Sequence, residues 1–221
     1  MPTVPKKSAG AAGPRDPAPR IFLLSPANMA GVRAKLLLNP NAPFPLAREF
    51  RRNGLPLADV FTFTSGLYFR GKITYANHFA RATRRDVVRV ITSNAGLVDP
   101  REVVGRGHIE AYGETEIEVT DPRYHEPLRR DAQLLARRVG KRGQVILLGS
   151  IATPKYRDVL LDVFGERLLF PVDFVGRGDM SRGALLLRAV EADRELDYAP
   201  VRDAVLTGRR AVRASLVISA G

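Results

Sequence analysis

The sequence contains no cysteine, so it can form no disulfide bond, offer no thiolate to a metal and use no cysteine nucleophile. Its three histidines, His78, His108 and His125, lie far apart in sequence and lack the spacing of a metal site, so we predict no metal and no cofactor. No apolar run approaches the roughly 18 residues of a membrane span. The first residues also lack the apolar segment of a signal peptide, so we expect a cytoplasmic protein.

The composition points to a folded, strongly basic protein. Hydrophobic residues make up 45% of the 221 residues, enough for a sizeable core, and the formal net charge is +12. The first twenty residues contribute only +3, from Lys6, Lys7, Arg15 and Arg20 against Asp16, so the remainder still carries +9. Such a charge favours polyanionic partners, with nucleic acid the first candidate and an anionic membrane surface the second. The plain alternative is an arginine-rich composition with no such partner.

Strand and helix patterns alternate along most of the chain. Residues 1–19 are rich in Pro, Ala and Gly and predict a flexible basic tail, and residues 20–221 form one domain. We expect strands at 20–24, 60–64, 87–92, 144–148, 168–170 and 215–219, and helices at 30–38, 72–82, 126–139, 154–164 and 184–190. Residues 101–127 look irregular, with a β-like piece at 117–120. This order predicts an α/β fold, a single three-layer domain with a mostly parallel central sheet and helices on both faces.

A glycine-rich stretch, Gly176 to Gly183, precedes the last predicted helix. Asp179 or Ser181 is placed to cap that helix, and Arg177 and Arg182 flank its first turn. A helix N-terminus with two neighbouring arginines suits an anion, and phosphate is the obvious one. The alternative is a capped helix after a glycine turn, with both arginines in water.

In parallel α/β folds, ligands collect where the strands end. The predicted strand exits here are small, polar or basic, so we expect one concave pocket at that edge. The pocket residues that we expect are Ser25, Asn28, Tyr68, Asn94, Ser150 and Ser181. The residues that we expect to contact nucleic acid are Arg70, Lys72, Lys155, Arg177 and Arg182.

Four short blocks at these exits resemble, in the same order, motifs of the YaaA-like peroxide-stress resistance family. Leu23 to Asn28 is similar to the family's Leu-Leu-Ser-Pro-Ala-Lys, and Phe63 to Tyr68 resembles its Phe-x-Gly-x-x-Tyr block. Ile91 to Pro100, with Tyr112, resembles a third block. The most specific match is Arg177 to Arg182, which resembles Arg-Gly-x-Met-Ser-Arg.

The resemblance implies DNA binding in oxidative stress and a fold related to uracil-DNA-glycosylase-like domains, one of which occurs in archaeosine-forming tRNA enzymes. The chain departs from the family at Asn28, where the family has lysine. Any role that needs that ammonium group is therefore in doubt here.

Two functions from different classes follow. The first is a nucleic-acid-binding protein that acts in stress response or repair, and we expect DNA as its partner ahead of RNA. The second is a base-processing enzyme of glycosylase or transglycosylase type, in which Asp99 or Asp179 supplies the carboxylate, Tyr68 stacks a base and Asn28 or Asn94 reads its edge. Each residue also has a plain role: Asp99 in a turn, Asp179 as a helix cap and Tyr68 in the core. A small-molecule phosphate binder is a third possibility.

Overall fold

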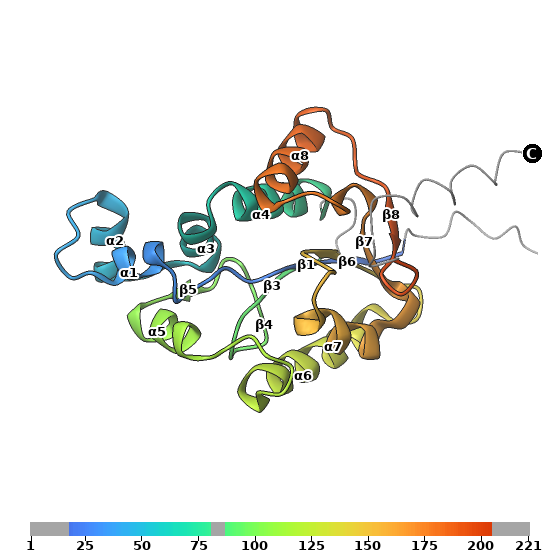
Figure 1. The fold of residues 1–221 in the computed structure, drawn as a ribbon, viewed down its shortest axis with the longest axis horizontal. Helices are drawn as coiled ribbons and strands as arrows, with labels where there is room; N and C mark the ends of the chain where they lie inside the picture. Colours follow the sequence, from blue (N-terminus) through green and yellow to red (C-terminus); the bar gives the residue numbers. More distant parts are fainter. Residues whose placement is uncertain (1–17, 81–86, 205–221) are drawn as a thin grey trace, which may run out of the picture.

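A computed structural model describes residues 18–80 and 87–204 and has an α/β fold (Figure 1). Its central six-stranded sheet has the order β4-β3-β1-β6-β7-β8. The parallel centre consists of β3 (Val87–Ile91), β1 (Arg20–Leu24), β6 (Gln144–Leu148) and β7 (Leu168–Pro171). At the two sides, β4 (Leu97–Val98) and β8 (Tyr198–Pro200) run antiparallel to their neighbours. The expected fold class is therefore confirmed.

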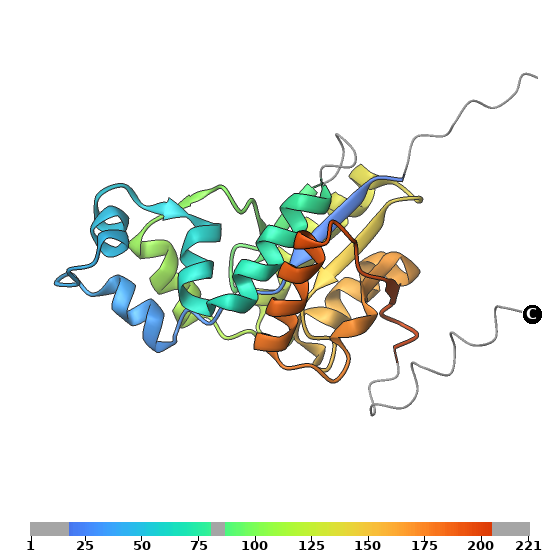
Figure 2. The ribbon, with the colours of Figure 1, turned by 90° about the horizontal axis from the view of Figure 1, so that it is seen from above.

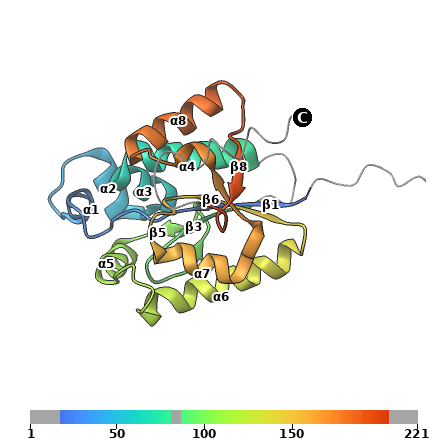
Figure 3. The same ribbon diagram turned by 45° about the vertical axis from the view of Figure 1, so that its right-hand side comes forward.

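Successive residues of the central strands point to opposite faces, which gives the sheet two hydrophobic layers. Phe22 and Leu24 pack under α3 (Leu57–Ser65), α4 (Leu67–Phe79) and α8 (Asp179–Glu191). Ile21 and Leu23 pack against α6 (Pro122–Val139) and α7 (Pro154–Phe164) on the other face. Figure 3 shows the sheet between these two layers of helices.

The remaining helices extend the molecule beyond the ends of the central strands. Helices α1 (Val32–Leu38), α2 (Pro45–Asn53) and α5 (Arg106–Glu114) lie at one end of the long axis, far from β8 at the other (Figures 1 and 2). A small second sheet joins β2 (Leu55–Pro56) to β5 (Val103–Val104). Two short 3₁₀ turns, η2 (Gly165–Arg167) and η3 (Val172–Phe174), flank β7.

The predicted strand at 60–64 is wrong, because these residues lie inside α3. Their β-branched and aromatic side chains favour a strand locally, but Leu57, Val60 and Phe61 are buried at the spacing of a helical face. The strand exit that we expected at Ser65 is instead the glycine-containing turn between α3 and α4.

Several other expectations need correction. The interval 101–127 contains α5 and the start of α6, and residues 117–120 form no strand. The helical pattern at 126–139 predicts Leu134 on the inner face, but Leu134 is 56% exposed, because the buried face of α6 runs through Leu128, Ala132 and Leu135. Helix α8 begins at Asp179 and its N-cap is Gly178, so neither Asp179 nor Ser181 is the cap. Most of the predicted tail and the strand at 215–219 lie outside the described residues.

Within the described ranges, no helix is long and apolar enough to cross a membrane. The same residues hold no group of three or more His, Cys, Asp or Glu side chains that could bind a metal ion.

Candidate functional site

The central parallel strands all end at one edge of the sheet, which we call the carboxyl-end edge. Here Lys72, from the middle of α4, reaches the end of β1 and is fully buried. Its Nζ lies 2.7 Å from the main-chain oxygen of Ser25 and 2.9 Å from the Ser25 hydroxyl. Ser25 is itself buried, so both partners are withdrawn from water.

The environment of Lys72 disfavours its charged form. Burial lowers the pKa of Lys72 to about 7; Asp179 opposes this shift, and Arg182 adds to it. Lys72 forms no ion pair with any described carboxylate. Its Nζ lies 4.5 Å from the ring centre of Tyr68 and 4.9 Å from that of Phe69. These rings attract the charged form, whereas burial favours the neutral amine and holds the pKa of Lys72 below its ordinary value.

Two tyrosine hydroxyls lie beside this pair. Burial raises the pKa of Tyr68, and the nearby Arg182 opposes this shift. No described residue accepts a hydrogen bond from the Tyr68 hydroxyl. Burial also raises the pKa of Tyr156, whose hydroxyl is adjacent to Ser25. We call Ser25, Tyr68, Lys72, Tyr156 and Arg182 the strand-end cluster.

Arg182 is held mainly by the protein itself. Its Nε and Nη2 both donate to the main-chain oxygen of Phe174 at 3.2 Å, and its guanidinium lies over the Phe174 ring. Nη1 is 3.5 Å from the carboxylate of Asp179, and only 13% of the Arg182 side chain is exposed. This geometry favours a structural role in the loop over the predicted phosphate contact.

Replacing Arg182 with alanine should therefore lower the free energy of unfolding by about 2 kcal/mol, the usual size for hydrogen bonds from a charged group. Nucleic-acid affinity should change little. Lysine at this position should not restore stability, because it lacks the planar pair of donors. Urea unfolding and a DNA titration measure the two effects, and Arg177→Ala, on an exposed side chain, is the control. A stable Arg182→Ala variant with weakened DNA binding would instead support the phosphate contact.

A cleft of about 520 Å³ opens beside the cluster, between the end of β1 and the segment that follows α5. It brings together two of the predicted residues, Asn28 and Lys155. Acidic side chains that we did not predict, Glu116 and Glu118, line it as well. We call this the carboxyl-end cleft, and its volume suits a nucleotide-sized ligand.

Other predicted pocket residues lie apart from this cleft. Asn94 lines a separate hollow next to α5. Ser150 and Ser181 are absent from the cleft lining, and Ser181 is exposed and accepts a hydrogen bond from Arg177. The single concave pocket that we expected is therefore divided into the buried cluster, the cleft and this hollow.

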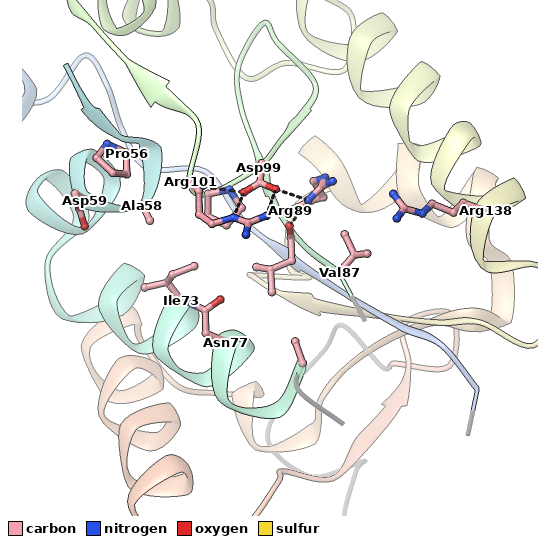
Figure 4. A pocket seen from close by; sticks show the side chains of 13 residues that line it. Pro56, Ala58, Asp59, Ile73, Asn77, Val87, Arg89, Asp99, Arg101 and Arg138 are labelled. Carbon is pink, nitrogen blue, oxygen red and sulfur yellow. Dashed lines mark hydrogen bonds and ion pairs between the residues drawn. The ribbon is translucent and has the colours of Figure 1, made fainter. Parts of the chain in front are cut away.

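Asp99 lies in a different cleft of about 570 Å³, between α3, α4 and the β3–β4 hairpin (Figure 4). Because β4 runs back antiparallel to β3, it carries Asp99 away from the carboxyl-end edge to the level of Arg89. Hydrogen bonds from Arg101, together with the charge of Arg89, lower the pKa of Asp99 to about 2. The predicted place of Asp99 at the carboxyl-end edge is wrong, and its carboxylate is committed to two arginines.

The residues predicted to contact nucleic acid divide into two kinds. Lys72 is fully buried, so its prediction as a surface phosphate contact is wrong. Arg70, Lys155 and Arg177 are exposed. Arg177 donates to the main-chain oxygen of Asp173, whereas Arg70 and Lys155 make no side-chain hydrogen bond or ion pair with the described residues.

A second basic surface lies where the strands begin, which we call the amino-end edge. Four exposed residues lie at the end of α6 and in the turn before β6, and none has an ion pair or side-chain hydrogen bond within the described ranges. They are Arg137, Arg138, Lys141 and Arg142, and we call them the amino-end patch.

Comparisons with family models, curated proteins and solved structures find no match.

The sequence did not predict the contact between Ser25 and Lys72, nor the amino-end patch. Nothing in the pattern around Lys72 distinguishes it from an exposed helical lysine, because only packing against α8 and β1 buries it. The sequence places Arg137 and Arg138 on the outer face of the helix at 126–139, and the usual meaning of such a charged face is solvation. Their significance depends on the neighbouring chain segments that the fold brings to the same edge.

Proposed function

We propose that this protein binds nucleic acid, DNA in preference to RNA, mainly through phosphates. The observation that carries the proposal is the amino-end patch, four exposed cationic side chains with no carboxylate partner within the described ranges. Exposed cationic side chains without an acidic partner also occur elsewhere on the molecule, among them Lys35 and Arg70, but the four of the amino-end patch lie together. A group of unpaired cations on one edge is the electrostatic footprint of a polyanion site.

The fold brings three chain boundaries to the same edge. Pro19 accepts a hydrogen bond from the first residue of β6, and Arg20 donates to the main-chain oxygen of Phe79. Arg202 pairs with Glu166 just before β7. Residues 1–17, 81–86 and 205–221 join the described chain at these points, and they contain nine Lys or Arg residues against two Asp. These ranges carry a net +7 of the formal +12, and each of them joins the described chain at this edge.

The resemblance to the YaaA-like family supports a role in stress response or DNA repair, because that family binds DNA under oxidative stress. The resemblance is independent of the amino-end patch, since its motifs lie at the opposite edge of the sheet. Both observations favour the same class of partner.

Salt-dependent DNA titrations test the proposal. If about four to six phosphates are neutralised, the slope of log affinity against log salt should be roughly −4 to −5. Replacing all four amino-end patch residues with alanine should reduce the magnitude of the slope by about 3 to 4, because each contact contributes about 0.9. Fluorescence anisotropy with a labelled duplex, repeated with RNA, measures the slope and the preference.

The matched control removes the same charge elsewhere, from Lys35, Arg48, Arg52 and Arg188, which are also exposed and unpaired among the described residues. A third variant replaces Arg70, Lys155 and Arg177. We expect the amino-end variant to lose most affinity. Equal losses for all three would mean that net charge alone drives binding, and salt-independent binding would contradict the proposal.

The carboxyl-end cleft favours a second candidate, a base-processing enzyme of glycosylase or transglycosylase type. The cleft offers the amide of Asn28 and the carboxylates of Glu116 and Glu118 to an extruded base, and the exposed carboxylate of Asp179 lies near the strand-end cluster. Incubation with oligonucleotides that carry uracil or oxidised bases, followed by mass spectrometry, would detect a released base. If Glu116→Gln released the base as fast as the wild type, the carboxylate of Glu116 would be excluded as the catalytic group.

A further inference from the structure

The strand-end cluster contains a hydroxyl and an amine in direct contact, and neither is needed for binding DNA. We propose that Ser25 and Lys72 form a nucleophile–base pair that accepts an acyl group from a small carboxylic ester. The 2.9 Å separation of Ser25 Oγ and Lys72 Nζ is the geometry that proton transfer from a nucleophile to its base requires. This activity goes beyond nucleic-acid binding and can be tested separately.

The hydrogen-bond partners of Lys72 suit a neutral amine. Its Nζ has two oxygen partners among the described residues, the main-chain oxygen and the hydroxyl of Ser25. A neutral amine can donate to the carbonyl and accept the serine proton with its lone pair, which uses both partners. An ammonium group would donate to both oxygens and direct its third proton toward the Tyr68 and Phe69 rings, but it has no lone pair to accept the serine proton.

The groups that face Lys72 act on its charge in opposite directions, and burial decides the outcome. Tyr68 precedes it by one turn of α4, Tyr156 approaches from α7, and Asp179 and Arg182 approach from α8. Asp179 attracts a proton to Lys72 and Arg182 repels it, while burial dominates both. Without a close carboxylate partner, the amine exchanges its proton near neutral pH.

Tyr68 supplies a donor that lacks an acceptor. Its hydroxyl is buried, and the neighbouring Arg182 can only donate to it, so the hydroxyl proton has no acceptor among the described residues. Unsatisfied buried donors are uncommon in proteins and need an explanation. In the proposed reaction, the hydroxyl donates to the oxygen that becomes negative when Ser25 attacks the ester.

The carboxyl-end cleft begins directly after Ser25 in the chain, because Pro26 to Asn28 line it, although Ser25 and Lys72 do not line it themselves. Ser25 is 6% exposed and Lys72 is fully buried, so the proposal is restricted to small acyl groups.

The proposed step is balanced. Ser25 Oγ forms a bond to the ester carbonyl carbon while Lys72 Nζ takes the hydroxyl proton. The bond from that carbon to the alcohol oxygen then breaks, and the leaving alcohol takes the proton from Lys72. Water completes the cycle by the same route, so that a carboxylic acid and the free serine are formed.

The test uses the full chain with p-nitrophenyl acetate as the probe. We expect an initial burst of one p-nitrophenol per chain, with an acetyl group on Ser25 located by mass spectrometry of peptides when the reaction is stopped during that burst. The rate should rise with pH and level off above neutrality as Lys72 loses its proton. Lys72→Met should slow acylation about 100-fold or more, the usual contribution of a general base. Lys72→Arg should do the same, because arginine keeps the charge and cannot accept a proton.

The chain contains a matched control. Ser93 is also a buried serine at the carboxyl-end edge, but its hydroxyl donates to the main-chain oxygen of Tyr112, and it has no amine beside it. Ser93 should remain unmodified, and Ser93→Ala should react like the wild type. Circular dichroism of each variant confirms folding. Absence of an adduct on Ser25, or an equal rate in a folded Lys72→Met variant, would overturn the proposal.

Discussion

Gly183→Ala should destabilise the protein by about 1–3 kcal/mol, even though alanine is the better helix former. For a protein of this size, the melting temperature should fall by several degrees. The reason is the contact between α4 and α8, which lie side by side in Figure 2 and meet at Gly71 and Gly183. A Cβ on Gly183 would lie 2.7 Å from the main-chain oxygen of Leu67 and 2.9 Å from the Cα of Tyr68.

The clash cannot be relieved by a side-chain rotation, because the opposing atoms belong to the backbone. Gly71 on α4 meets the same limit, since its Cβ would lie 2.6 Å from the oxygen of Gly183. Separating the helices would loosen the packing around Lys72 and Tyr68, which lie on α4 next to this crossing. Gly183→Ala should therefore also weaken any reactivity of the strand-end cluster.

Gly107 is the matched control, because it lies in α5 and a Cβ there would meet no atom within 4 Å. Gly107→Ala should stabilise the protein by roughly 0.5–1 kcal/mol through helix propensity and the reduced freedom of the unfolded chain. Urea unfolding should show a lower free energy of unfolding for Gly183→Ala and a higher one for Gly107→Ala, because only the first substitution meets the α4–α8 contact. Stabilisation by both substitutions would show that the helices separate freely.

The central strands were predictable because their signal is local. Residues 20–24 and 144–148 are short apolar runs bounded by polar or small residues, as expected for strands covered on both faces. Parallel pairing then places their carboxyl ends at one edge, so the position of Ser25 and Ser150 near that edge was accessible from the sequence.

Elements whose state depends on tertiary packing were not predictable in the same way. The run Val60 to Thr64 has strand-forming residues, yet its burial against α4 and Tyr112 selects a helix. The two-residue strand β4 is too short to leave a pattern, and it alone decides that Asp99 leaves the carboxyl-end edge. Lys72 shows the same limit, because a lysine in a helix is usually exposed.

Lys72 also determines how stability should vary with pH. The pKa of a free lysine side chain is 10.5, and burial lowers it to about 7 in the folded protein. Between these values the unfolded chain binds more protons than the folded chain, so the free energy of unfolding rises with pH. Below pH 7 both states are protonated and the contribution is constant. Below pH 7 the burial of the charged lysine lowers the free energy of unfolding by its full amount, and this penalty disappears as the pH approaches 10.5.

The expected gain from pH 7 to pH 9 is about 2 kcal/mol, at about 1.4 kcal/mol per pKa unit over the steep part of this range. Lys72→Met should remove this gain. Methionine relieves the cost of burying a charge but leaves the main-chain oxygen of Ser25 without its donor. The free energy of unfolding of Lys72→Met, relative to that of the wild type, should therefore be highest at pH 7. By pH 9 this difference should have fallen by about 2 kcal/mol.

Urea unfolding at pH 7, 8 and 9 measures the difference between the two proteins, and other titrating groups cancel in that difference. Lys155→Met, which removes an exposed lysine from the same edge, should leave the pH dependence of the wild type unchanged. A constant difference between wild type and Lys72→Met across this range would mean that the lysine stays charged in the folded state. The proton transfer proposed for Ser25 would then have no neutral amine to accept it.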